Sequence, residues 1–368
     1  MTCISTFSYQ LSVRVLAAAS LCLAFATGQS SEGEVQYRRG VTLLREKKFA
    51  EAAGQLEAAA RLSPGVAPVW LAVAHARLET GRVAEARAAA AEARKLGAAD
   101  SNIARGLATF YRQLAKKLLA AREPSGAVEA WQEAIALAPG DASPYAELAG
   151  LFLDHRTPEP AIAVLTAALA RIPNDADLLR LQGLAHYAAG ENAKAIEAFL
   201  RLMDLAPDAE ESYTTVETLL PEAGDQLPGI TARLRRYSSA RPSSPVGHFL
   251  LAQALAVSEP GTSQIETLLR EAIRVEPKFW PAHFEVHKAL LARGAVRDAA
   301  GALERAVELN PDYAPARYAL AQVYAALEDR IRAAAERRAH HALVTREREA
   351  AQARTAAMPP LPYKLLKR

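Results

Sequence analysis

Cysteine is nearly absent from this sequence. Only two of the 368 residues are cysteines, Cys3 and Cys22, and both lie within the first 28 residues. Without that segment the chain can form no disulfide bond and offers no thiol for catalysis or metal binding. Hydrophobic residues make up 51% of the sequence, so we expect the fold to be stabilised by packing of a large apolar core.

Catalytic motifs are absent as well. The sequence has no Gly-x-Ser-x-Gly nucleophile motif and no Gly-x-x-x-x-Gly-Lys-Ser/Thr phosphate loop. The 44 Lys and Arg residues nearly balance the 41 Asp and Glu residues, and a net charge of +3 does not mark a nucleic-acid-binding protein. We therefore expect a chain that is not an enzyme, with no catalytic residues, no metal, no cofactor and no nucleic-acid partner.

An apolar segment near the N-terminus has the form of an export signal. Arg14 precedes the apolar run at residues 15–26, and small-x-small signal peptidase sites end at Ala26 and at Gly28. The sequence therefore predicts a cleavable secretory signal at residues 1–28. It predicts an exported protein, periplasmic or secreted in a bacterium.

Two other interpretations of this segment are weaker. The apolar run has about 12 residues, whereas a helix needs about 20 to span a bilayer, so a stable transmembrane anchor is not expected. A bacterial lipoprotein would use Cys22, but the bulky Leu21 stands before it, where lipoprotein signals have a small residue.

Two sets of residues recur with the same period along the chain. The first set, called here the alanine ladder, is spaced by 34 or 35 residues with one longer step of 41, from 86 to 127: Ala52, Ala86, Ala127, Ala161, Ala195, Ile230, Ile265, Ala299 and Ala333. The second set consists of prolines that each follow a ladder residue by 12 positions: Pro64, Pro139, Pro173, Pro207, Pro242, Pro277 and Pro311. Two patterns with one period and one phase indicate a repeat protein.

The length of the repeat limits its structure. About 34 residues hold two helices of three to four turns and two short turns. Apolar residues at helical spacing before Ala161, and again after it, support a pair of helices in each repeat. A small residue is required where two helix axes cross closely, which explains the alanine ladder. The sequence therefore predicts an all-α solenoid of stacked antiparallel helix hairpins.

The repeats resemble the tetratricopeptide repeat (TPR) family over residues 33–345. The family pattern of an aromatic residue, leucine-glycine, tyrosine, alanine, an aromatic residue and proline is met in register, for example by Leu179, Gly183, Gly190, Ala195, Phe199 and Pro207. The resemblance implies about nine units in a right-handed superhelix. It also implies a concave surface, lined by the first helix of each unit, that binds other proteins.

Three departures from the pattern are visible. Seven extra residues near 98–106 predict a long connection between the second and third units. The sixth unit, residues 210–242, is degenerate: Pro221, Gly224, Pro228 and Gly229 are expected between its helices. Residues 346–368 are predicted to hold the end of a capping helix and a flexible, proline-rich basic tail, with one continuous helix expected from about 331 to 353.

The resemblance places twelve residues on the predicted concave surface: Tyr37, Leu71, His75, Arg112, Lys116, Arg180, Leu184, Tyr187, Phe284, Lys288, Tyr318 and Gln322. Their mixture of apolar, aromatic and basic side chains suits a peptide or protein partner with acidic and apolar residues. Arg112 and Lys116 lie one helical turn apart and are predicted to hold one carboxylate. We therefore expect a non-catalytic protein-interaction scaffold, in assembly of a cell-envelope complex, with self-association left open.

The alternative is a ligand-binding, metal-binding or hydrolytic protein that uses the region of His283 and His287. These histidines are four residues apart and share a helix face, as zinc ligands do. However, Glu285 is one position away from its place in the metalloprotease motif, and the sequence shows no third ligand.

Overall fold

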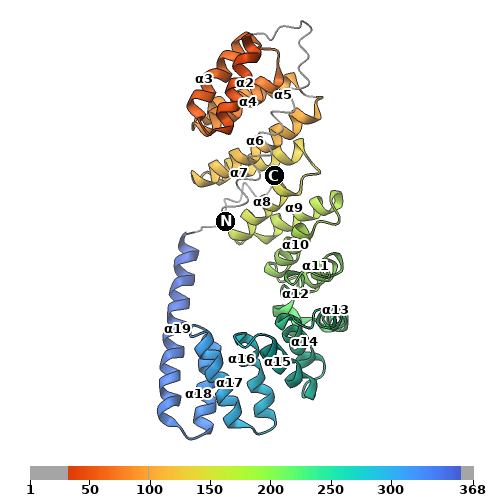
Figure 1. Cartoon of the computed structure of the whole chain (residues 1–368), viewed down its shortest axis with the longest axis vertical. Coiled ribbons are helices and arrows are strands. Elements are labelled where there is room, and N and C mark those ends of the chain that lie inside the picture. Colours follow the sequence, from red (N-terminus) through yellow and green to blue (C-terminus); the bar gives the residue numbers. More distant parts are fainter. Residues whose placement is uncertain (1–31, 98, 358–368) are drawn as a thin grey trace. The chain divides into compact units, whose positions relative to one another are not determined.

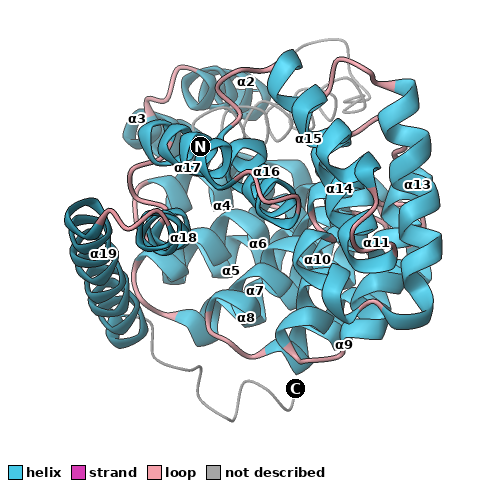
Figure 2. Cartoon of the chain, turned by 90° about the horizontal axis from the view of Figure 1, so that it is seen from below, coloured by secondary structure: helices cyan, strands magenta, loops and turns pink. Residues whose placement is uncertain are grey.

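A computed structural model describes residues 32–97 and 99–357 of the chain. The predicted export signal at 1–28 and the end of the predicted tail, from residue 358, lie outside this part. Within it the regular structure is entirely helical, with short connecting loops and no strand (Figure 2). The prediction of an all-α fold is confirmed.

The described residues form nine helix–turn–helix units (Figure 1). The first helices of the units are α2 (Glu32–Arg45), α4 (Ala67–Glu79), α6 (Ser101–Ala120), α8 (Ala142–Asp154), α10 (Ala176–Ala188), α12 (Glu211–Thr214), α14 (Pro245–Ser258), α16 (Trp280–Ala292) and α18 (Ala314–Ala326). The second helices are α3 (Phe49–Leu62), α5 (Val83–Leu96), α7 (Pro124–Leu137), α9 (Pro158–Arg171), α11 (Asn192–Leu205), α13 (Leu227–Ala240), α15 (Ser263–Val275), α17 (Val296–Leu309) and α19 (Arg330–Ala357).

The alanine ladder marks the buried side of the second helices. Seven ladder positions are fully buried: Ala52, Ala86, Ala127, Ala161, Ala195, Ile230 and Ala299. Ala333 is nearly so, with 3% of its surface exposed. Ile265 is the exception, because it is only half-buried. A methyl group at these positions lets the helix backbones approach closely, whereas a longer side chain would force them apart.

The proline ladder marks the end of the second helices. In each of the seven cases proline stands two residues beyond the last helical residue, as Pro64 follows α3. Proline lacks the backbone N–H that a continuing helix requires. Its free carbonyl is used in most units by a side chain six residues later. Trp70, Tyr145, Tyr213, His248, His283 and Arg317 each place a side-chain nitrogen or hydroxyl within 2.8–3.3 Å of that oxygen.

The chain divides into two compact units. The first contains residues up to Leu148 and a short segment at 170–173, and its core includes the buried Tyr37, Leu56 and Phe110. The second contains residues 149–169 and 174–360. A continuous apolar core runs through it from α11 to α17, around residues such as Phe199 and Leu255.

The extra residues at 98–106 do not lengthen a connection, as the sequence predicted. Most of them belong to α6, which begins at Ser101 and has 20 residues, whereas α4 and α10 have 13. Asp100 caps the helix by accepting a hydrogen bond from the backbone N–H of Asn102. Ile103 is buried, so this additional length has an apolar anchor.

The sixth unit is irregular, as expected, but its irregularity lies in the first helix. That helix is reduced to α12 and two 3₁₀ segments, η1 (Glu217–Glu222) and η2 (Gly224–Gln226). Pro228 and Gly229 do not lie between the helices; they form part of the first turn of α13. Proline is tolerated there because the first helical N–H groups have no intrahelical acceptor.

The final helix is continuous, as predicted, and has 28 residues. Figure 1 shows α19 beside α18 and extending beyond it. Among the described helices, none combines the length and the apolar character needed to cross a membrane.

Candidate peptide-binding groove

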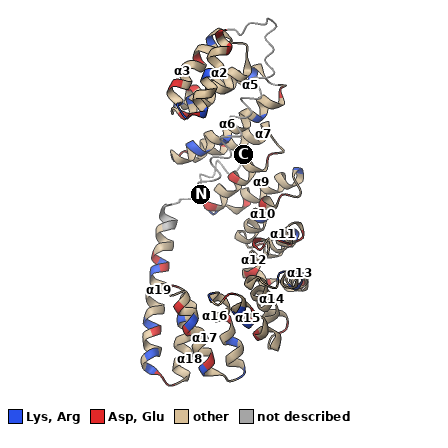
Figure 3. Cartoon of the chain, in the orientation of Figure 1, with Lys and Arg blue, Asp and Glu red and all other residues tan. Residues whose placement is uncertain are grey.

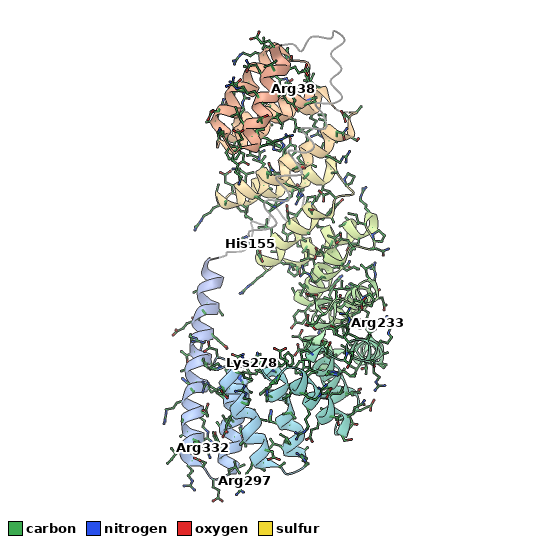
Figure 4. All side chains as sticks on the ribbon, in the orientation of Figure 1. Arg38, His155, Arg233, Lys278, Arg297 and Arg332 are labelled. Atoms are coloured by element: carbon green, nitrogen blue, oxygen red, sulfur yellow. The ribbon has the colours of Figure 1, made fainter. Side chains whose placement is uncertain are left out.

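A groove lined by aromatic residues lies in the second compact unit. It has a volume of about 350 Å³. We call it the aromatic groove, and define it by the residues that line it: Thr214, Glu217, Val246, Phe249, Leu250, Gln253, Phe279, Trp280, Pro281, Phe284, Glu285 and Tyr313. They come from the N-terminal halves of α14 and α16, from the start of η1 and from the turn before α18. Lys278, labelled in Figure 4, precedes α16 by two residues and marks this end of the helix.

The rings of the groove contact one another across three successive units. Phe249 and Phe279 pack edge to face with ring centroids 5.5 Å apart. Tyr313 lies 4.6 Å from Trp280 and 5.1 Å from Phe284 by the same measure. Aromatic pairs at these separations are mutually stabilising, so the wall of the groove is held in place before any ligand arrives.

Two carboxylates face this aromatic surface. Burial raises the pKa of Glu217 above its ordinary value, and the charge of Glu285 raises it further. Burial is also the main cause of the raised pKa of Tyr313, with Glu285 and Glu217 adding to it. The mutual effects show that these three groups lie near one another in a partly desolvated place.

One cation already stands at the edge of the groove. The Nζ atom of Lys288 lies 2.7 Å from a carboxylate oxygen of Glu285 and 5.7 Å from the centroid of the Phe284 ring. The Lys288 side chain is 63% exposed, whereas that of Glu285 is only 11% exposed. Within the described residues, no ion pair or hydrogen bond reaches the carboxylate of Glu217.

Only part of the surface predicted from the sequence is open. Tyr37 and Leu71 are each 1% exposed and belong to the core, and His75 is 6% exposed. The Nδ1 atom of His75 lies 3.0 Å from Gln113 of the next unit. The prediction that these three contact a partner is wrong, because packing between successive hairpins covers their positions.

Arg112 and Lys116 do hold a carboxylate, but it belongs to this chain. Arg112 donates to Glu147 over 2.7 Å, and Lys116 lies 2.9 Å from the same oxygen. The Trp131 indole donates to the other oxygen over 2.8 Å. Burial alone would raise the pKa of Glu147, but the hydrogen bonds and charges of the two basic residues outweigh it and lower the pKa.

The remaining predicted residues are at least partly accessible. Phe284 lines the aromatic groove and Lys288 lies beside it. Tyr187, Tyr318 and Gln322 are exposed, and Leu184 is half-buried. Arg180 is 3.7 Å from Asp177. Figure 3 shows Lys and Arg interspersed with Asp and Glu on the helices, as these ion pairs require. A role for these residues in partner binding stays a prediction.

Sequence reasoning missed most of the groove: Glu217, Phe249, Phe279, Trp280 and Tyr313. Phe279 and Tyr313 stand just before their helices, so a projection of helix faces leaves them out. A usable sign was present, however. Aromatic residues are only 6% of the chain, yet three of them fall within residues 279–284.

The histidines of the alternative hypothesis have structural partners. His283 lies 3.0 Å from the carbonyl oxygen of Pro277, in the same repeat position as Trp70 and Tyr145. His287 is buried and contacts the Phe284 carbonyl through Nδ1. Over residues 32–97 and 99–357, no three His, Cys, Asp or Glu side chains are grouped to hold a metal ion. This geometry gives the metal-site hypothesis no support.

Helix pairs repeated at a 34-residue period define an all-α solenoid. Family models described as tetratricopeptide repeat match residues 43–109, 112–176 and 147–210. The chain is a tetratricopeptide-repeat protein. Among curated proteins, none matches it.

Several solved structures have a similar arrangement of helices. MamA residues 41 to the end from Desulfovibrio magneticus RS-1 is 19% identical, with a TM-score of 0.39, covering 47% of this chain and 96% of MamA. Yeast Tom70 is 14% identical, with a TM-score of 0.46, covering 96% of this chain and 93% of Tom70. The C-terminal part of a TPR-containing protein from Cytophaga hutchinsonii is 15% identical, with a TM-score of 0.46, covering 77% and 98%.

Proposed function

We propose that this chain is a non-catalytic protein-interaction scaffold, and that the aromatic groove binds a segment of its partner. The observation that carries the proposal is the concentration of five rings around a groove of about 350 Å³. Large, partly exposed rings supply much contact area at a small entropic cost, which is why aromatic residues dominate binding hot spots.

The position of the groove supports the same conclusion. It is built by the first helices of consecutive units and the turns before them, where TPR proteins bind peptides. Its size suits a few side chains of an extended or helical segment, and its neighbouring rings are already packed together. A preformed site loses little conformational entropy when it binds.

The setting of this interaction is part of the proposal. If residues 1–28 direct export, as their sequence predicts, the partner belongs to the cell envelope or the surroundings of the cell. Assembly of an envelope complex is the role that such a scaffold would serve. Fusion of residues 1–28 to a reporter that is active only after export tests this setting; a reporter that stays inactive contradicts it.

A matched pair of variants tests the groove itself. Phe279→Gln removes a half-buried ring of the groove, and Tyr318→Gln removes an exposed ring outside it. A partner is first captured by the wild-type chain from its own cell envelope and purified, and its binding segment is then titrated calorimetrically. We expect at least a tenfold loss of affinity for Phe279→Gln and little change for Tyr318→Gln. Equal affinity of all three proteins, with helical content unchanged, contradicts the proposal.

A further inference from the structure

Glu285 of the groove stands in the same repeat position as Glu147. Each precedes the ladder alanine of its unit by 14 residues, since 299 − 285 and 161 − 147 are equal. Glu147 is bound by Arg112 and Lys116, which come from the first helix of the preceding unit. The chain thus contains one example of how a carboxylate at this position is satisfied. A guanidinium and an ammonium group approach it from the neighbouring repeat.

The basic residues that serve Glu147 have no counterparts beside Glu285. Arg112 precedes Glu147 by 35 residues, and the residue 35 before Glu285 is Leu250; by the same count Ala254 replaces Lys116. Leu250 and Ala254 are both buried and apolar. Lys288, from the same helix, is the only described residue that forms an ion pair with Glu285.

Glu217 adds a second carboxylate at the same place. It lies at the start of η1, close enough to Glu285 for the two charges to repel, and no described residue pairs with it. Two carboxylates and one lysine leave an excess of negative charge in a partly buried groove. A like-charged pair that is partly desolvated destabilises the free protein, and a ligand of opposite charge relieves that cost.

We propose that the aromatic groove takes a lysine or arginine side chain of the bound segment, which lies against the rings and pairs with Glu217 and Glu285. The rings favour this charge as well, because a cation is attracted to the face of Trp, Tyr or Phe. Lys288 illustrates the geometry at the rim, since it contacts Glu285 and lies over the Phe284 ring. The inference rests on the proposed function and adds the chemistry of the partner. It reverses, for this groove, the acidic preference expected from the sequence.

A selection experiment tests this preference without knowledge of the natural partner. A random octapeptide library displayed on phage is selected on the full chain, and each enriched peptide is tested again on the Phe279→Gln variant. We expect peptides that depend on Phe279 and carry Arg or Lys at a fixed position beside bulky apolar residues. Enrichment of Phe279-dependent peptides without a basic residue overturns the cation proposal and leaves the binding groove intact. Failure to enrich any Phe279-dependent peptide contradicts the groove as well.

Isosteric substitutions then test the charge alone. In one enriched peptide, Arg or Lys is replaced by citrulline or norleucine, which keeps most of the shape and removes the charge. We expect affinity to fall about tenfold or more with this peptide, and comparably when the original peptide meets Glu217→Gln or Glu285→Gln. Glu347→Gln on α19, which changes an exposed carboxylate outside the groove, serves as the control. Equal binding by all these pairs overturns the proposal.

Discussion

Individual carboxylates in this protein have opposite energetic roles that follow from their neighbours. Glu147 has two basic residues and an indole N–H around it, whereas Glu217 has burial and a second carboxylate. The former stabilises the fold in its charged form. The latter destabilises it, which is the usual cost of a group kept for binding.

Removal of the Glu147 charge is expected to destabilise the protein. In Glu147→Ala the Arg112 guanidinium, whose side chain is 15% exposed, loses its closest acceptor. A buried donor left without a partner costs about 1–3 kcal/mol in free energy of unfolding. Urea denaturation at pH 7 measures the loss. Glu92→Ala, which removes an exposed carboxylate 4.0 Å from Lys95, should change stability by less than about 1 kcal/mol.

The pH dependence of the Glu147 contribution follows from its lowered pKa. A carboxyl whose pKa is lower in the folded state stabilises the protein above its unfolded pKa, about 4.3 for glutamate. That contribution decreases as the pH falls through the folded-state value. The stability difference between the wild type and Glu147→Gln should therefore shrink in acid. A difference that is the same at pH 7 and at acidic pH contradicts the assignment.

Glu217→Gln is expected to have the opposite effect on stability. The pKa of Glu217 is raised by burial and by Glu285, so at neutral pH its charged form is less favourable in the folded than in the unfolded chain. The variant should melt at a higher temperature at pH 7, and its advantage should disappear below the ordinary glutamate pKa. The same variant should bind a basic peptide more weakly. A lower melting temperature at pH 7 contradicts this account.

At the scale of helices, two local rules made most of the fold predictable. Alanine at Ala52 or Ala195 permits a close crossing of helices, and proline at Pro64 or Pro207 stops the second helix two residues earlier. Both effects depend on neighbours in the same repeat. The lengthened α6 was not predicted, because an insertion next to a turn extends a helix as readily as a loop.

The binding surface was harder to predict, for a physical reason. Which residue of a first helix is open depends on the adjacent unit, more than 30 residues away in sequence. His75 is covered by the next unit, and Arg112 is held by Glu147. Neither contact is visible in the periodicity of the first helix. Accordingly the sequence indicated Phe284 and Lys288 but not the rings around them.

Two glycines of the first unit test the packing of its helices. At Gly40 on α2, a Cβ atom would lie 2.5 Å from Cγ of the fully buried Leu56, whereas at Gly54 on α3 it would meet nothing within 4 Å. Gly40→Ala should therefore cost about 1–3 kcal/mol through overpacking. Gly54→Ala should gain about 0.5–1 kcal/mol, because alanine loses less backbone entropy in a helix. Chemical denaturation of both variants provides the test, and equal effects would show that α2 and α3 are not packed as described.

For the whole molecule, the account assigns binding to one region of a long repeat array. The groove lies in the second compact unit, and its aromatic residues belong to three consecutive repeats. Charges elsewhere are largely paired within the chain, as at Arg112 or Arg233. Because exposed charges are screened by salt, affinity for a basic segment should decrease as ionic strength rises.

The most direct test is to map where a bound segment lies on the chain. A peptide selected for binding is made with a photoreactive residue beside its basic residue, crosslinked to the full chain, and its attachment points are identified by mass spectrometry. The account predicts attachment at residues 246–253, at 279–285 or at Tyr313, with loss of these products in Phe279→Gln. Attachment confined to other parts of the chain, unaffected by that substitution, would contradict the assignment of binding to the aromatic groove.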